Sequence, residues 1–241
     1  MREFLRQLLG GGFRRFANEI MSNGPAGRTM EGALRRLAPA RQVQTVVDVG
    51  ASNGRWSIMA SRHFPGARYL LVEAQAAAHE TALRKLHARR PQMEFVLAAA
   101  GAREGTVHFD ASDPLGGMAS EQQLPGPSIE VPVTTIDAEV ARRRMPGPFL
   151  IKLDTHGFEV PILEGAAQTL QQTAILVIEA YNFDLSPTSL RFPQMSLWVE
   201  KRGFRCIDLA DVLYRPRDGA LWQMDLFFVR DPGLEGRQAY R

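Results

Sequence analysis

Three residues in the second half of the chain carry side chains suited to proton transfer. Asp154 and His156 stand two positions apart at the end of one apolar run, and Glu179 ends another. Strand positions i and i+2 face the same side, so continued strand geometry would place Asp154 and His156 together. Imidazole titrates near neutral pH and can accept a proton. We predict that His156 is a general base, that Asp154 orients it or the substrate, and that Glu179 contacts the substrate.

Each of these residues also has an ordinary structural interpretation. Asp154 could hydrogen-bond the following turn while His156 faces solvent, and Glu179 could pair with an arginine. The three side chains together could also bind a metal ion through oxygen and nitrogen atoms. With one histidine and no second pair of ligands, we expect no metal here.

A loop earlier in the chain is suited to bind a nucleotide-like cofactor. The apolar run ending at Val49 is followed by small residues and then by a helical pattern from Arg55. Gly50 and Gly54 permit positive φ and let a ligand approach the backbone. Free amides at the start of the helix face such a ligand. The predicted cofactor contacts in this segment are Asp48, Gly50, Ala51, Ser52, Asn53 and Gly54.

Two residues further along extend the predicted cofactor site. Glu73 lies nineteen positions beyond Gly54 at the end of the next strand. A carboxylate there can accept hydrogen bonds from both hydroxyls of an adenosine ribose. Ala99 lies in the turn after the third strand, where adenine would meet backbone groups and apolar side chains. With Asp154, these residues complete the predicted cofactor-binding set.

Three chemistries compete for the glycine loop. A dinucleotide site needs G-x-G-x-x-G, but Ser52 stands where a second glycine would be and a third is missing. The segment 50–54 also fits the G-x-S-x-G elbow of hydrolases, yet only one strand precedes it and the last histidine is His156. S-adenosylmethionine has no pyrophosphate and needs fewer glycines, and Asp48 can face its amino-acid portion through the loop or a water. We favour this third interpretation and keep an NAD-dependent oxidoreductase as the alternative.

The elements around these residues alternate between strand and helix patterns, which predicts βαβ units and a doubly wound α/β fold with a mostly parallel sheet. Two further strands, 106–110 and 129–134, flank a loop at 111–128 that we expect to form a flap over the strand ends. The last two strands read as an antiparallel pair. Predicted strands are 43–49, 68–73, 94–98, 149–154, 174–180, 204–209 and 222–229, and predicted helices are 55–63, 75–90, 158–171 and 190–202.

The composition fits one folded domain with appendages. The chain has 241 residues, of which 45% are hydrophobic and 23% charged, so disorder is disfavoured. Residues 1–42 hold eight arginines against three glutamates, with apolar residues at helical spacing. This pattern favours amphipathic helices docked on the domain rather than a nucleic-acid-binding arm. We divide the chain into an N-terminal helical extension (1–42), a cofactor-binding domain (43–230) and a C-terminal tail (231–241).

Cysteine content and hydropathy bear on the compartment. Cys206 is the single cysteine, so no internal disulfide can form and a reducing compartment is expected. No run reaches the roughly 18 apolar residues that cross a bilayer, and arginines interrupt the start of the chain. We expect a cytoplasmic protein without a transmembrane segment. The sequence leaves open whether it forms a homo-oligomer.

Four motifs, in order, resemble the FkbM family of S-adenosylmethionine-dependent methyltransferases. Residues 151–159 read I-K-L-D-T-H-G-F-E, similar to the family signature I-K-[IL]-D-x-x-G-[FY]-E, and residues 46–54 match V-x-D-V-G-A-x-x-G. The strand and T-I-D of 131–137 and the closing strand 223–229 also resemble the family. The resemblance covers about residues 43–230. Where His156 stands, family members often carry Glu or Gln.

The resemblance implies a class I methyltransferase fold, with a seven-stranded sheet whose last strand is antiparallel. It also implies S-adenosylmethionine as cofactor and methyl transfer to a hydroxyl of a sugar, glycan or polyketide-type small molecule. We therefore expect a small-molecule or glycan acceptor with a free hydroxyl, and no nucleic acid. A methyltransferase-like binding module without activity is a further alternative.

Overall fold

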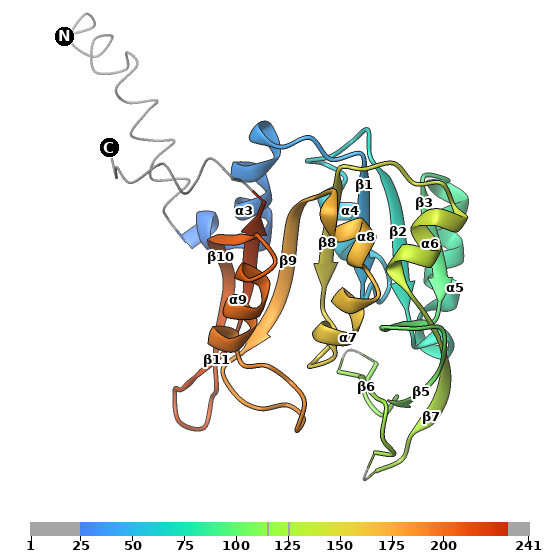
Figure 1. Ribbon diagram of the computed structural model, residues 1–241, viewed down its shortest axis with the longest axis vertical. Helices are drawn as coiled ribbons and strands as arrows, with labels where there is room; N and C mark the ends of the chain where they lie inside the picture. The colour runs from blue at the N-terminus through green and yellow to red at the C-terminus, as the bar shows by residue number, and fades with distance from the viewer. Residues whose placement is uncertain (1–24, 115, 125, 231–241) are drawn as a thin grey trace, which may run out of the picture.

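A seven-stranded sheet forms the centre of the computed structural model, which describes residues 25–230 except 115 and 125 (Figure 1). The strand order is β10-β11-β9-β8-β1-β2-β3. Neighbours from β9 to β3 pair in parallel, whereas β11 is antiparallel to both β9 and β10. The predicted mostly parallel sheet with an antiparallel last strand is confirmed. The strands are β1 (Thr45–Val49), β2 (Arg68–Glu73), β3 (Met93–Leu97), β8 (Phe149–Leu153), β9 (Thr173–Tyr181), β10 (Arg205–Tyr214) and β11 (Leu221–Val229).

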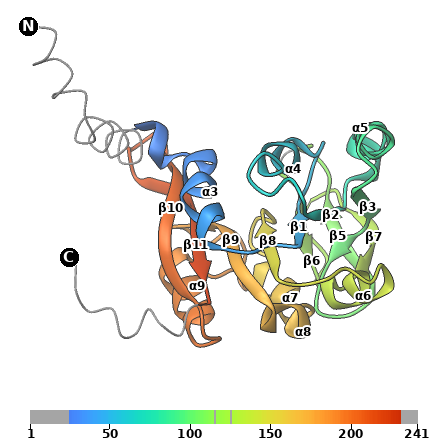
Figure 2. The same ribbon diagram turned by 90° about the horizontal axis from the view of Figure 1, so that it is seen from above.

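Helices cover both faces of this sheet, as the doubly wound prediction requires (Figure 2). On one face, Leu34, Ala60 and Leu83 are buried against strand residues of the same apolar cluster. On the other, Ile162 and Val199 belong to a second cluster. The first layer contains α3 (Met30–Leu37), α4 (Arg55–Ala60) and α5 (Ala76–Arg89), and the second contains α6 (Ile136–Arg142), α7 (Glu159–Glu164), α8 (Ala167–Gln171) and α9 (Phe192–Glu200).

The central strands are buried on both faces, which explains their continuous apolar runs. All five residues of β1 and of β8 are buried. Asp48 in β1 and Lys152 in β8 are therefore polar side chains inside the core, and each needs a partner there. Both residues lie close to the carboxyl ends of their strands, next to the predicted site.

A small second sheet lies beside the carboxyl ends of the main strands, at the lower edge in Figure 1. Its order is β4-β7-β5-β6, and β5 is antiparallel to both neighbours. The strands are β4 (Ala99–Ala100), β5 (Gly105–Asp110), β6 (Met118–Ser120) and β7 (Ile129–Thr134). The two extra strands predicted from the sequence are confirmed, and β6 is an additional short strand within the 111–128 loop.

Two helix predictions need correction. The helix predicted over 158–171 is two helices, α7 and α8, and they are separated at Gly165, where a Cβ would lie 2.0 Å from the carbonyl oxygen of Gly101. Helix α6 was not predicted at all. It begins after Thr135, whose side chain accepts a hydrogen bond from the Ala138 amide.

The described part of the N-terminal extension docks on the outer strands. The backbone amide of Met30 donates to Asp211, and Arg36 pairs with Asp208 at 2.7 Å. Short 3-10 turns at Pro25–Arg28 and Ala38–Ala40 flank α3. The amphipathic pattern of residues 4–20 and the tail 231–241 lie outside the described residues. No helix in the described ranges is long and apolar enough to span a membrane.

Candidate active site

A cleft opens at the carboxyl ends of β1, β2 and β8, next to the 111–128 loop. It holds about 660 Å³ of empty space including its open mouth. Of the predicted site residues, it is lined by Gly50, Ser52, Glu73, Ala99, Asp154 and His156. Lining residues that were not predicted are Val49, Val72, Ala74, Gln75, Ala98, Ala100, Phe109, Pro114, Gly117, Ala119, Thr155, Phe158 and Ile162.

The turn after β1 brings the backbone to the wall of the cleft. Gly50 has a φ of +73°, and a Cβ on it would lie 2.0 Å from the carbonyl oxygen of Asp154. Its amide donates to the Val72 carbonyl at 3.0 Å. Ser52 also has a positive φ, of 50°. The turn is thus folded tightly between two strand ends, where only glycine fits at position 50.

Glu73 ties the glycine turn to the end of β2. One carboxylate oxygen accepts from the Ser52 amide at 2.6 Å and the other from the Gln75 amide at 2.7 Å. The side chain is buried but still reaches the cleft. Because each carboxylate oxygen has two lone pairs, both can accept a further hydrogen bond from a ligand.

These features fit an adenosine cofactor. The glycine turn leaves room for a ligand against the backbone, and Glu73 offers two acceptor oxygens suited to ribose hydroxyls. Ala99, Phe158 and Ile162 supply apolar walls of the kind an adenine ring needs. The cleft therefore combines a few placed polar groups with an apolar lining.

Four predicted cofactor residues do not line the cleft. The Asp48 carboxylate is fully buried below the turn, where it accepts from the Ser57 hydroxyl at 2.7 Å; any influence on the cofactor passes through the loop. Ala51 is buried, and the exposed Asn53 accepts from the Arg55 amide. Gly54 packs against α5, since a Cβ there would lie 2.4 Å from Leu86. These residues shape the turn and do not contact the cleft.

The buried Lys152 ammonium forms ion pairs with two carboxylates. Its Nζ lies 2.7 Å from Asp154 Oδ2 and 3.7 Å from Asp48 Oδ1. Burial alone would lower the pKa of Lys152, but Asp154 and Asp48 raise it above its ordinary value. Burial likewise favours a raised pKa for Asp154, and the Lys152 ammonium overrides it, so that the pKa of Asp154 is lowered. Burial raises the pKa of Asp48 despite the same lysine.

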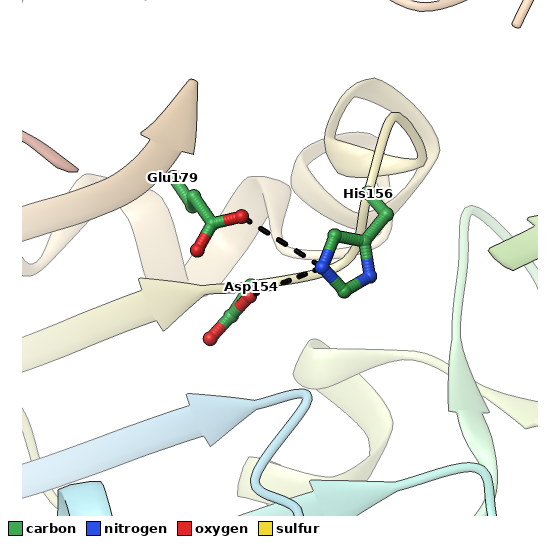
Figure 3. Close-up of side chains that lie close together, drawn as sticks. All are labelled: Asp154, His156 and Glu179. Atoms are coloured by element: carbon green, nitrogen blue, oxygen red, sulfur yellow. Dashed lines mark ion pairs between the residues drawn. The ribbon is translucent and has the colours of Figure 1, made fainter. Parts of the chain in front are cut away.

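Asp154, His156 and Glu179 converge on one point, as Figure 3 shows. His156 Nε2 lies 3.7 Å from Asp154 Oδ1 and 3.7 Å from Glu179 Oε1. The prediction that Asp154 and His156 lie together agrees with the structure, which also brings Glu179 to them, but the assumed strand geometry was wrong. Strand β8 ends at Leu153, and His156 has a left-handed φ of 51°. A tight turn, not strand alternation, directs the imidazole back over Asp154.

The flap fixes the orientation of the His156 ring. His156 Nδ1 lies 3.1 Å from the Gly117 carbonyl oxygen. A carbonyl oxygen can only accept, so Nδ1 carries the hydrogen. In the neutral ring, Nε2 then keeps a lone pair, and it is this atom that faces the two carboxylates. The backbone of the flap, rather than Asp154, orients the ring.

The pKa of Glu179 is shifted in the opposite direction from that of Asp154. Burial and the nearby Asp154 charge raise the pKa of Glu179 to about 7. The Tyr181 hydroxyl donates a hydrogen bond to Glu179 Oε1. The three converging groups are all held by neighbours, and their ligand atoms lie within 4.8 Å of one another, so the cluster could also bind a divalent cation.

Two residues at the start of α5 contact the backbone of the 111–128 flap, which the sequence did not reveal. The Gln75 amide group donates to the Asp113 carbonyl at 3.0 Å, and His79 Nε2 lies 2.9 Å from the Pro114 carbonyl. His79 is buried. Gln75 is the residue directly before α5 and His79 lies in the first turns of that helix, and nothing in the sequence pairs either residue with the flap. Pro114, Gly117 and Ala119 line the cleft, so the predicted flap is confirmed.

One protein family and several solved structures resemble this chain. The model of the methyltransferase FkbM domain matches residues 48–206, whereas no curated protein matches the sequence. Among solved structures, TrmK from M. capricolum in complex with S-adenosyl-homocysteine is 11% identical, with a TM-score of 0.48 and coverage of 83% of this chain and 68% of that one. Precorrin-6y C5,15-methyltransferase from Geobacter metallireducens GS-15 is 12% identical, with a TM-score of 0.45 and coverage of 83% and 86%.

The structural resemblances concern the fold and not the substrate. The family match covers more than half of the chain and includes the glycine turn, Glu73, Asp154, His156 and Glu179. The chain therefore belongs to the FkbM family of methyltransferases, and its cofactor is S-adenosylmethionine.

Proposed function

We propose that this methyltransferase methylates a hydroxyl oxygen of a sugar, glycan or polyketide-type small molecule, with His156 as the general base. When bound, S-adenosylmethionine supplies an electrophilic methyl group. The acceptor oxygen would bond to that methyl carbon as the bond between the methyl group and sulfur breaks, S-adenosylhomocysteine would leave, and His156 Nε2 would take up the hydroxyl proton. An alcohol is a weak nucleophile while it keeps its proton, so a placed base contributes about 10²- to 10⁴-fold.

The observation that carries this proposal is the hydrogen bond from His156 Nδ1 to Gly117 O. It leaves Nε2 as the acceptor atom at the edge of the cofactor cleft. After proton transfer, the imidazolium lies 3.7 Å from carboxylate oxygens of both Asp154 and Glu179. These oxygens stabilise the positive charge that forms on the ring.

Lys152 and the flap support the same step. The buried ammonium keeps Asp154 ionised, because it lowers the pKa of that carboxyl. Pro114 and Gly117 of the flap line the same cleft as His156. Holding two reactants in one orientation contributes about 7 to 11 kcal/mol to such a reaction. Positioning by the cleft is thus the larger effect, and the base adds to it.

The experiment uses purified full-length protein and S-adenosylmethionine labelled in its methyl group. Hydroxylated glycosides, polyketide-type alcohols and transfer RNA are offered separately, and the labelled atom of each product is assigned by NMR and mass spectrometry. We expect a methyl ether on a sugar or polyketide-type acceptor. A product methylated on nitrogen or carbon, or labelled RNA alone, would contradict the proposal.

A further inference from the structure

A second hollow adjoins the catalytic cluster on the side away from the cofactor cleft. It lies at the carboxyl ends of β9 and β10, beside the start of α3, and it holds about 1430 Å³ of empty space including open solvent. Glu179 lines this hollow and is 3.7 Å from His156, which lines the cofactor cleft. The two cavities therefore meet at the His156–Glu179 pair. The hollow is lined by Arg28, Thr29, Glu179, Leu209, Asp211, Val212, Leu213, Tyr214, Gln223 and Asp225.

Two carboxylates form its polar part. Asp225 in β11 is the register partner of Glu179 in β9, so the two acids stand directly opposite each other. Like charges in that relation destabilise a strand pair. Asp225 is only 9% exposed, and within the described residues no hydrogen bond to its carboxylate and no ion pair are found. Burial and the neighbouring Glu179 raise the pKa of Asp225 to about 8. A ligand that brings a hydrogen-bond donor or a cation would stabilise a buried acid of this kind.

Among the described residues, no other charged group in or near the hollow pairs with Asp225. Asp211 already accepts a hydrogen bond from the Met30 amide. The Lys152 ammonium lowers the pKa of Asp225, but its ion pairs are with Asp48 and Asp154. Arg28 lines the hollow from the N-terminal extension, and no ion pair between it and Asp225 is found in the described part of the chain.

The rim of the hollow is apolar. Leu209, Leu213 and Tyr214 are 44%, 51% and 63% exposed, and all three line the hollow. Large apolar side chains exposed together beside buried acids indicate a ligand site with an apolar body and a polar end. Tyr214 also offers an aromatic face for a ring.

We propose that this hollow is the acceptor site and that it selects an acceptor with a protonated amine next to the reacting hydroxyl and an apolar substituent. The amine lies between Glu179 and Asp225, the apolar part lies on Leu209, Leu213 and Tyr214, and the hydroxyl faces His156 Nε2. A neutral polyol could donate hydrogen bonds to the two acids but would leave their ionised forms as unfavourable as in the free protein, where the pKa values of both acids are raised. An ammonium group pairs with both. This inference rests on the proposed O-methyltransferase function and names its substrate class.

Three matched ligands test the proposal by calorimetric titration of full-length protein saturated with S-adenosylhomocysteine. They are the octyl glycosides of glucosamine, N-acetylglucosamine and glucose, each used below its micelle concentration. Charge-assisted hydrogen bonds predict that the glucosaminide binds at least about tenfold more tightly than either neutral glycoside. In D225N this preference is expected to disappear while S-adenosylhomocysteine affinity stays at the wild-type level, which also confirms that the variant is folded.

Equal affinity for the three glycosides, binding of none of them, or a preference that survives in folded D225N would overturn the proposal. The wild-type comparison is decisive even if D225N does not fold. Failure of the proposed function gives a different result. In that case the amine preference is present, but the glucosaminide is methylated on nitrogen or the labelled methyl goes elsewhere.

Discussion

His156 Nδ1 and the carbonyl oxygen of Gly117 lie 3.1 Å apart, although 39 residues separate them in the chain. The contact links the turn after β8 to the flap over the cofactor cleft. It leaves Nε2 free to face Asp154 and Glu179. The position of the flap and the orientation of the proposed base are therefore linked by this hydrogen bond.

Substitution of Gly50 tests the turn after β1. In G50A, a Cβ would lie 2.0 Å from the Asp154 carbonyl oxygen, at a φ of +73°. The strain costs about 1 to 3 kcal/mol of stability and displaces the backbone that lines the cleft. We expect a lower melting temperature and at least about tenfold weaker S-adenosylhomocysteine binding by calorimetry. The control is G66A, because a Cβ there meets nothing within 4 Å; wild-type affinity in G50A would contradict the assignment of this turn.

Lys152 is predicted to be essential for stability. In K152M, Asp48 and Asp154 lose their buried cation. Breaking a buried ion pair by removing one partner costs about 3 to 5 kcal/mol. Urea unfolding should show a loss of this size, whereas K85M, on the exposed face of α5, should unfold like wild type. A loss below about 1 kcal/mol in K152M would show that the two carboxylates do not depend on it.

Stability should depend on pH through Asp225. Burial raises its pKa from 3.8 to about 8, so the folded state keeps a proton that the unfolded chain releases. The group therefore costs no stability below pH 3.8 and lowers stability progressively as the pH rises to about 8. In D225N this penalty is absent. Melting temperatures from pH 4 to 9 should show a lead of D225N over wild type that grows up to about pH 8; a constant difference would refute the assigned environment.

Chelation distinguishes a base from a metal ion at the Asp154–His156–Glu179 cluster. The three ligand atoms are close enough to bind a divalent cation, but the proposed step uses the lone pair of His156 Nε2. We expect methyl transfer by protein treated with EDTA and then desalted to equal that of untreated protein. If EDTA treatment abolished methyl transfer and added Mn²⁺ or Mg²⁺ restored it, the cluster would act through a bound cation and not through a base.

Much of the fold could be predicted because its strands are strongly apolar and its helices alternate with them. The continuous run of β1 and the period of α5 left little ambiguity. Short elements were harder to predict. Helix α6 has only seven residues, and β6 has three and depends on pairing with β5. Such segments are stabilised by tertiary contacts and carry too few residues to show a period.

The site was predicted less completely than the fold. Motif residues at strand ends, such as Glu73 and Asp154, line the cleft because parallel strands end at the same edge. The predicted residues Asp48 and Gly54 turn away from the cleft, since alternation and the start of α4 direct them into the core. Gln75 and Gly117 could not be assigned, because their roles depend on how the flap folds back across the sheet edge.

The most direct test of the account measures binding and catalysis separately in H156N. In the proposed mechanism His156 is a base toward the acceptor and does not bind the cofactor, so the variant should bind S-adenosylhomocysteine with the wild-type Kd, while kcat for a methylated acceptor falls about 10²- to 10⁴-fold. The matched control is H108N, since His108 lies on β5 and does not line the cleft; its kcat should be unchanged. Full turnover in H156N with intact cofactor binding would contradict the assignment of His156 as the base.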